Sequence, residues 1–271
     1  MKRLSELFVI LCCVAALAPI TWTASSSLKS AAELTLVPPT LLPHAPTLSN
    51  YEVLLFKRPF LRYCLNSFVI ATMTSLLCVA AACLAAHRLA RMRGSVRAIA
   101  RLGLLVVAFF PPIVFIFPLY ELIRAAGLVN HPWGLILPYS ALNLPFAIWL
   151  LTGSFQQIPY ELEEAASIDG LSRFQTFRKI VLPLVTPALI TAGILVFVSS
   201  WNEFMLALTF LNVESEKTVT LGVATLSGAF AEEIPYGQIA AGVIASSIPL
   251  ILLVLIFQRR IIAGLTAGAV K

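Results

Sequence analysis

Three neighbouring residues, Trp201, Asn202 and Glu203, have the side chains best suited to recognise a ligand. Glu203 is the only carboxylate well inside a long apolar segment. A charge at the depth of a membrane span costs at least about 2.5–3.5 kcal/mol unless it faces a cavity or a partner. A tryptophan face, an amide and a carboxylate suit a ligand that has an apolar ring face and hydroxyl groups. Helix packing, or pairing of Glu203 with a charge on another subunit, is an equally supported alternative.

Asn143, two residues before Pro145, is a further candidate for the same pathway. Its alternative role is to satisfy a carbonyl that the proline frees. We expect no catalysis, because the three histidines lie in loops or at segment ends with no partnered Ser or Cys. The five cysteines form no CxxC and no Cys/His cluster, so we expect no metal site and no disulfide framework.

The composition is too apolar for a soluble enzyme. Of the 271 residues, 59% are hydrophobic and only 12% are charged, whereas a soluble domain is about 25% charged. The net charge of +6 comes with no basic tract carrying interleaved aromatics, so nucleic acid is not an expected partner. We therefore predict an integral membrane protein with a single transmembrane domain, residues 1–271.

A spanning helix needs about 20 mostly apolar residues. We predict an all-α polytopic protein with six transmembrane helices: Leu7–Thr23, Asn66–Ala86, Leu102–Ile123, Trp133–Phe155, Pro187–Leu211 and Ile239–Ile262. Prolines interrupt the third and fourth segments, which membrane helices tolerate where neighbouring helices or water satisfy the freed carbonyls. That favours a bundle around a cavity. Cleavage of the first segment as a signal peptide is an alternative, because Met1-Lys2-Arg3 precedes it.

The distribution of Lys and Arg sets the orientation. With the N-terminus inside, most of the 19 Lys and Arg residues fall on the inside, and both termini are predicted to be cytoplasmic. The second inside loop holds five arginines that we interpret as a topology anchor: Arg88, Arg91, Arg93, Arg97 and Arg101.

The third inside loop, residues 157–184, is predicted to form two short helices joined at a glycine. Pro159 suits the first position of the first helix. Gly170 suits a left-handed C-terminal cap. Ser172 and Gln175 have the spacing of a capping box that begins the second helix.

The second helix carries an apolar stripe that includes Phe174 and Phe177, and Pro183 is expected to end it before the fifth span. Both phenylalanines are predicted to be exposed, because the loop is too short to bury them against a domain of its own. Such a helix either lies on the membrane surface or docks into a groove on a partner.

This loop resembles the EAA motif of permease subunits of binding-protein-dependent ABC importers, and we call it the EAA loop. The motif reads EAA, three residues, G, nine residues, I, one residue, LP. The matching residues are Glu164, Ala165, Ala166, Gly170, Ile180, Leu182 and Pro183. The resemblance extends over nearly the whole chain, to the MalG-type branch of sugar permeases, through segments such as Trp201–Phe204 and Gly264–Lys271.

The resemblance implies that the EAA loop is a coupling helix seated in a cleft of a separate cytoplasmic ATPase. The motif residues would make that contact together with Phe174 and Phe177. Two such ATPase subunits, a second homologous permease subunit and an extracytoplasmic substrate-binding protein would complete the importer in the bacterial inner membrane. ATP and Mg would be held by the ATPase. This chain has no GxxxxGK[ST] phosphate loop and is expected to bind no cofactor.

The resemblance thus implies an ABC importer type I permease fold and import of a disaccharide, an oligosaccharide or a glycosylated polyol by alternating access. Trp201, Asn202, Glu203 and Asn143 are the candidates for the substrate pathway. Glycerol-3-phosphate is the alternative substrate. A stand-alone secondary carrier is the rival mechanism, although a carrier usually has more intramembrane ionisable residues. Four glutamates after the fifth span are expected to help dock the binding protein: Glu214, Glu216, Glu232 and Glu233.

Overall fold

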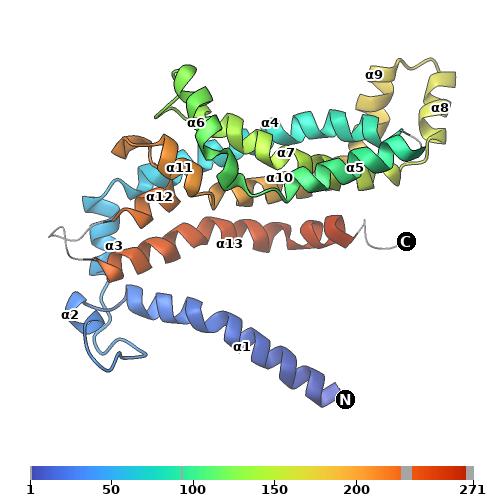
Figure 1. Ribbon diagram of the computed structural model, residues 1–271. Coiled ribbons are helices and arrows are strands. Elements are labelled where there is room, and N and C mark those ends of the chain that lie inside the picture. Colours follow the sequence, from blue (N-terminus) through green and yellow to red (C-terminus); the bar gives the residue numbers. More distant parts are fainter. Residues whose placement is uncertain (1, 93, 227–233, 267–271) are drawn as a thin grey trace. The chain divides into compact units, whose positions relative to one another are not determined.

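The computed structural model describes residues 2–92, 94–226 and 234–266, and the side chains of 6–92, 94–226 and 234–258. Within those ranges the chain is helical and contains no strand, which confirms the all-α prediction (Figure 1). Some features of the sequence analysis lie outside the described residues: Glu232, Glu233, Arg93 and residues 267–271. The side chains of Arg259 and Arg260 also lie outside the described part. The chain divides into two compact units: residues 1–65 with 217–251 (unit 1), and residues 66–216 with 252–271 (unit 2).

Five helices in the described part of the chain are long and apolar enough to cross a membrane. They are α1 (Lys2–Ser27), α4 (Phe60–Ala90), α7 (Trp133–Gln156), the continuous helix Arg173–Trp201, and α13 (Tyr236–Thr266). A sixth crossing is formed by a bent pair, if the pair counts as one span. The six predicted spans correspond to these segments.

The third predicted span, Leu102–Ile123, is not one continuous helix. Helix α5 (Gly94–Ala108) stops before Pro111, and the 3₁₀-helix η2 (Pro112–Phe115) and α6 (Ile116–Ala125) follow at a bend of 81°. Each of two consecutive prolines biases the residue before it away from the helical region, and Pro111 is extended, with ψ 119°. The break therefore follows from the sequence Pro111-Pro112.

The fifth predicted span, Pro187–Leu211, both begins and ends earlier than expected, because the helix stops at Trp201 and α11 (Met205–Phe210) follows after a break. Helix α9 (Arg173–Thr176), the π-helical turn η3 (Phe177–Val181) and α10 (Leu182–Trp201) form one helix. The prediction that Pro183 ends the loop helix is wrong. A proline ring clashes with the carbonyl four residues earlier in a regular α-helix. The wider π-helical turn directly before Pro183 accommodates the ring.

Unit 1 contains a polar cluster that follows α1 and holds α2 (Ala31–Leu34). Lys29 is buried: its Nζ donates to the Thr40 carbonyl and lies 4.8 Å from the centre of the Trp22 ring. Glu33 accepts hydrogen bonds from the His44 backbone N–H and the Thr40 hydroxyl, both at 2.9 Å. The pKa of Glu33 is lowered, chiefly by the His44 backbone bond.

The rest of unit 1 contains α3 (Ser49–Glu52), the π-helical turn η1 (Val53–Lys57) and α12 (Val219–Ala224). Helix α12 packs closely on the start of α4. A Cβ atom at Gly222 would lie 2.2 Å from Cδ2 of Tyr63, so only glycine allows this approach. This contact joins segments far apart in the sequence.

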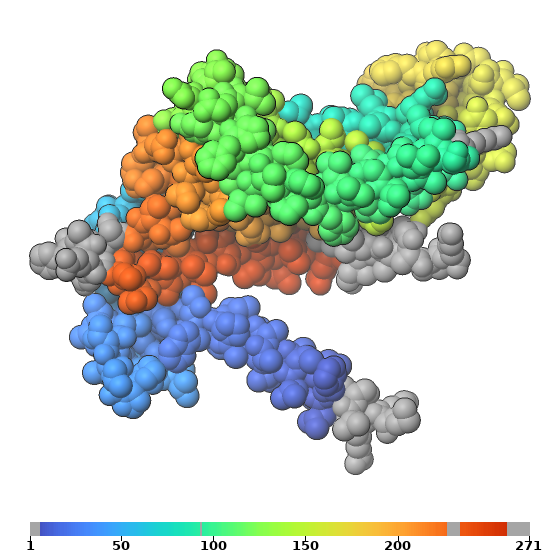
Figure 2. Space-filling view, viewed as in Figure 1, coloured from blue at the N-terminus to red at the C-terminus, as the bar shows by residue number. Residues whose placement is uncertain are grey.

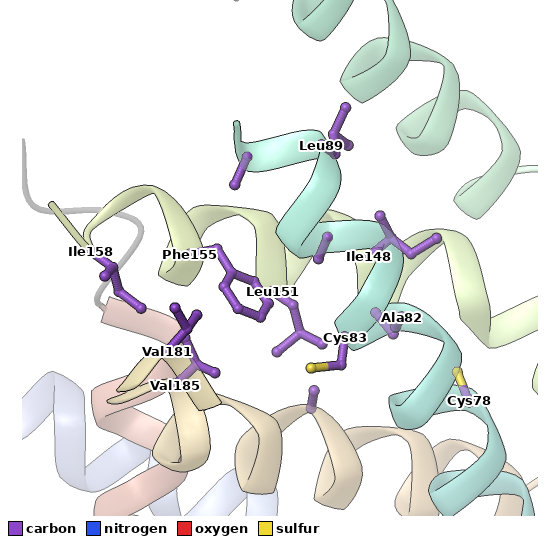
Figure 3. Close-up of a cluster of buried hydrophobic side chains, with 14 of the residues drawn as sticks. Cys78, Ala82, Cys83, Leu89, Ile148, Leu151, Phe155, Ile158, Val181 and Val185 are labelled. Atoms are coloured by element: carbon purple, nitrogen blue, oxygen red, sulfur yellow. The ribbon is translucent and has the colours of Figure 1, made fainter. Parts of the chain in front are cut away.

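Unit 2 has its apolar core where α4, α7 and α10 meet. Figure 3 shows Cys83 of α4 and Leu151 and Phe155 of α7 close to Val181 and Val185. The remaining elements of unit 2 are α8 (Glu161–Ile168), α11 (Met205–Phe210) and the 3₁₀-helix η4 (Glu214–Glu216). Helices α8 and α9 lie at one end of this unit and α6 and α11 at the other (Figure 1).

Candidate functional site

A cavity of about 800 Å³ lies within unit 2, between α5, η2, α7, α10 and α11. Its wall is mostly apolar, and its polar side chains include Tyr139, Asn143, Ser199 and Glu203. Cavities of this size with a few convergent polar groups are typical of small-molecule sites. The structure therefore brings two of the four predicted pathway residues, Asn143 and Glu203, to one cavity.

Glu203 lies in the break between α10 and α11. Its Oε1 accepts the Leu206 backbone N–H at 2.9 Å, and its Oε2 accepts that of Ala207 at 3.2 Å. The Tyr139 hydroxyl also donates to Oε2. Backbone N–H groups at the start of a helix stabilise a carboxylate. These three donors explain how an acidic side chain is tolerated in an otherwise apolar segment.

Tyr139 is a functional candidate that sequence reasoning missed. It lies in α7, is 1% exposed, and lines the cavity. A tyrosine four residues before Asn143 in an apolar helix was the only available signal. Asn143 Nδ2 donates to the Tyr139 carbonyl at 2.8 Å. The carbonyl that Pro145 would leave without its helical partner is that of Ala141, so Asn143 bonds to a different carbonyl from the one the proline frees.

Trp201 and Asn202 do not line the cavity. Trp201 is 3% exposed and stacks on Phe197, with ring centres 5.8 Å apart. Asn202 is exposed, and its Nδ2 donates to the Val198 carbonyl at 2.9 Å. The aromatic part of the cavity wall comes instead from Phe146 and Trp149 of α7, whose rings stack at 6.4 Å. A role of Trp201 and Asn202 in substrate contact stays a prediction.

The EAA loop has the predicted helix-turn-helix form. Gly170 has a φ of +83°, in the left-handed region that favours glycine. Ser172 and Gln175 form the predicted capping box: the Gln175 N–H donates to Ser172 Oγ, and the Ser172 N–H donates to Gln175 Oε1. The prediction for Pro159 is wrong, because α8 begins at Glu161 with Tyr160 as its N-cap.

The residues of the EAA motif differ in exposure. Glu164, Ala165 and Pro183 are exposed, Ile180 and Leu182 are half-buried, and Ala166 is buried. Outside the motif, Phe174 is 70% exposed, as predicted, and Ile168, which sequence reasoning missed, is 86% exposed. These two apolar side chains flank the Gly170 turn, on a loop that projects from unit 2 (Figure 2).

The prediction that Phe177 is exposed is wrong. Its side chain is half-buried, packs against the apolar core of unit 2, and lies 5.1 Å from the His87 ring between centroids. Phe177 begins the π-helical turn that continues directly into α10, so its ring falls over the end of α4. The loop is short, but it packs on the ends of the spans.

Residues 78–266 match the protein family described as "Binding-protein-dependent transport system inner membrane component". The chain belongs to this family. It is therefore a permease subunit of binding-protein-dependent transport and a multi-pass inner membrane protein, as its apolar helices also indicate. The predicted family is confirmed.

Two relatives of this permease are 40% identical to it. The sulfoquinovosyl glycerol transport system permease protein SmoH of Agrobacterium fabrum aligns over 93% of this chain and 88% of its own length. The trehalose transport system permease protein SugB of Mycobacterium tuberculosis aligns over 94% and 93%. A chain of a bacterial ABC transporter involved in the import of alginate has the same fold, with a TM-score of 0.78, 23% identity and 95% coverage of both chains.

Proposed function

We propose that this permease forms half of the translocation pathway of an ATP-driven sugar importer. Its partners are a second homologous permease subunit, two cytoplasmic ATPase subunits and an extracytoplasmic substrate-binding protein. The observation that carries the proposal is the EAA loop, whose capped turn at Gly170 presents Ile168 and Phe174 to an outside partner.

A protein groove suits this loop better than the membrane surface does. Exposed aromatic and aliphatic side chains on a preformed turn have the character of interface anchors. Helices that lie on a membrane usually carry Lys or Arg on their polar face. The second helix of the loop does carry three exposed cations, Arg173, Arg178 and Lys179. Helix α8, however, carries Glu161 and Glu164, both exposed. An anionic lipid surface would repel it.

The cavity supports a sugar as the substrate. Stacked aromatic rings fit the apolar face of a sugar ring, and the polar groups of Tyr139, Asn143 and Glu203 can bond its hydroxyls. The two relatives named above carry sulfoquinovosyl glycerol and trehalose in their names. A disaccharide, an oligosaccharide or a glycosylated polyol is therefore the proposed substrate class.

Glycerol-3-phosphate, the alternative, suits the cavity less well. A phosphate is usually recognised by Arg or Lys. The described residues that line this cavity contain neither, and they contain the carboxylate of Glu203. That lining favours a neutral, hydroxyl-rich substrate.

The proposed mechanism is alternating access. ATP and Mg bind to the ATPase subunits, whose closure moves the EAA loops and turns the paired permeases from inward-facing to outward-facing. This chain contributes no catalysis and binds no cofactor. In this arrangement the EAA loop and both termini face the cytoplasm.

Uptake of labelled trehalose and of labelled glycerol-3-phosphate into proteoliposomes tests the proposal. The complete transporter, with its binding protein, is reconstituted with or without ATP. We expect glycoside uptake that requires both ATP and the binding protein. Uptake driven by an ion gradient without ATP would establish a secondary carrier, and preferential uptake of glycerol-3-phosphate would overturn the substrate assignment.

A further inference from the structure

The end of α4 holds a cluster of charged and aromatic side chains that the EAA motif does not include. His87 lies in the last turn of α4. Arg91, four residues after His87, directly follows the end of that helix. Glu163 lies in the first turn of α8. Arg91 Nη2 donates to Glu163 Oε1, and His87 Nε2 lies 3.4 Å from the same oxygen. All three residues belong to unit 2.

The cluster is screened from solvent by the loop. The side chains of Arg91 and Glu163 are each 18% exposed, and that of His87 is 24% exposed. Ion pairs in such partly buried positions are weakened by salt less than surface pairs are. Removing one partner leaves the other without its counter-charge in a poorly solvated place. The pair is therefore suited to hold one defined geometry.

His87 and Arg91, at the end of α4, contact both sides of the EAA loop. Arg91 Nη1 donates to the Ile158 carbonyl at 3.1 Å, and its guanidinium lies 5.5 Å from the Tyr160 ring centroid. On the other side, the His87 ring lies 5.1 Å from that of Phe177, between centroids. The entry to α8 and the helix that leaves the loop thus both rest on the end of α4.

Helix α4 is in turn tied to the two spans that flank the loop. Ser75 Oγ donates to the Gly193 carbonyl of α10 at 2.8 Å. Ser140 Oγ of α7 lies 3.4 Å from the Thr74 carbonyl. A displacement of α8 that Arg91 transfers to α4 therefore reaches the spans through contacts already present in unit 2.

We propose that Glu163, Arg91 and His87 form a latch that fastens the EAA loop to the end of α4 and transmits the movement of the loop to the spans. These are positioning residues, distinct from the surface that contacts the ATPase. Glu163 directly precedes the EAA motif and points to α4, whereas Glu164, the motif's own acidic residue, is exposed. The inference rests on the proposed function, because it requires an ATPase to move the loop.

The experiment compares transport per ATP hydrolysed in proteoliposomes of the complete transporter. The single variants are Glu163→Gln, Glu163→Arg and Arg91→Glu, and the double variant is Arg91→Glu with Glu163→Arg. Glu161→Gln is the matched control, since Glu161 lies in the same turn of α8 but is exposed. Co-purification of the ATPase and its activity without binding protein are measured in parallel.

We expect each single variant to retain the ATPase subunits and to lower sugar moved per ATP by about twofold to thirtyfold, the range found for residues within coupling networks. The double variant should recover most of that loss, because it restores the ion pair in reverse. Glu161→Gln should behave as wild type.

Wild-type coupling in the single variants would overturn the latch. A double variant that moves no more sugar per ATP than the two single variants would also overturn it. So would single variants whose coupling falls only because the ATPase subunits are lost. Failure of the proposed function looks different: the Ile168→Ala/Phe174→Ala variant would keep its ATPase, or the wild-type complex would show no ATP-dependent uptake.

Discussion

At one end of unit 2, the EAA loop exposes Ile168 and Phe174 and ties Glu163 to Arg91, which directly follows another helix. At the other end, the break between α10 and α11 places Glu203 beside a cavity and satisfies it with backbone N–H groups only three and four residues away. Each of these two regions connects longer helices, and each contains a carboxylate. The partners of the first carboxylate are distant in the sequence, and most partners of the second are local.

Under the proposed function, this difference separates a part that moves from a part that stays fixed. A carboxylate held by its own helix start keeps its geometry whenever that helix forms. A carboxylate held by a cation at the end of another helix keeps its ion pair only while the two helices keep their relative position. We therefore expect changes at the EAA loop to act on assembly and coupling, and changes at Glu203 to act on local stability and substrate contact.

The largest effect is expected from removing the exposed anchors of the EAA loop. Truncation of an interface hot spot costs about 2 kcal/mol or more, so Ile168→Ala with Phe174→Ala should weaken ATPase binding at least about thirtyfold. The measurement is ATPase co-purification with the detergent-solubilised complex. The two permease subunits should stay paired.

Phe117→Ala is the control for that variant, since Phe117 is 83% exposed but lies in α6, at the other end of unit 2. ATPase recovery at wild-type stoichiometry with the double variant would show that the loop lies on the membrane surface instead.

At Glu203 the expected effect is on folding stability and not on assembly. Glu203→Ala removes the acceptor of three hydrogen bonds, and leaving buried donors unsatisfied costs about 1–3 kcal/mol each. The variant should lower the thermal unfolding midpoint of the purified complex without releasing the ATPase. Glu203→Gln keeps one acceptor oxygen and should be milder, and Tyr139→Phe milder still. Release of the ATPase by Glu203→Ala would show that the two ends are not separable in this way.

A moderate effect on coupling is expected from Gly170→Ala. A side chain in the left-handed region costs about 1–2 kcal/mol, and the ideal Cβ position at Gly170 has open space around it. The strain should therefore act through the backbone, misaligning α8 and α9. The measurement is ATPase activity stimulated by the binding protein, which should fall while the complex stays assembled. Full stimulation would show that the turn tolerates a side chain.

The smallest effect concerns Glu33 in unit 1, a carboxylate held like Glu203 by a backbone N–H but outside the spans. Its folded-state pKa is lowered from the ordinary value of 4.5, chiefly by the His44 backbone bond. Its contribution to stability is therefore fully present above pH 4.5 and is lost as the pH falls through the lowered pKa.

Amide hydrogen exchange of residues 33–44 measures this loss, with Glu33→Gln compared at each pH to remove the intrinsic pH dependence. Wild type should be better protected than Glu33→Gln at pH 7, and the difference should vanish at strongly acidic pH. A difference that persists there would show that the Glu33 charge does not hold the cluster.

Local features of this permease were predictable from its sequence. The spans follow from apolar length, and the Gly170 turn and the Ser172 capping box depend only on neighbouring residues. The proline pair at 111–112 was noted as an interruption, but only the structure shows that it bends the span by 81°.

Contacts between distant segments were not predictable. Tyr139 and Glu203 are 64 residues apart, and Arg91 and Glu163 are 72 apart, so no sequence pattern links them. Arg91 was interpreted only as part of a topology anchor, because its charge is visible in the sequence and its partner is not. Phe177 was misjudged for the same reason: the surface that covers it comes from α4.

The bent third span also bears on how this chain enters the bilayer. Helix α5 has 15 residues and α6 has 10, which correspond to about 22 Å and 15 Å of rise. Neither reaches across a hydrocarbon core of about 30 Å. An insertion machinery that partitions one segment at a time would not accept either half as a complete span. We therefore expect the two halves to be inserted together, as one unit, and not as separate spans.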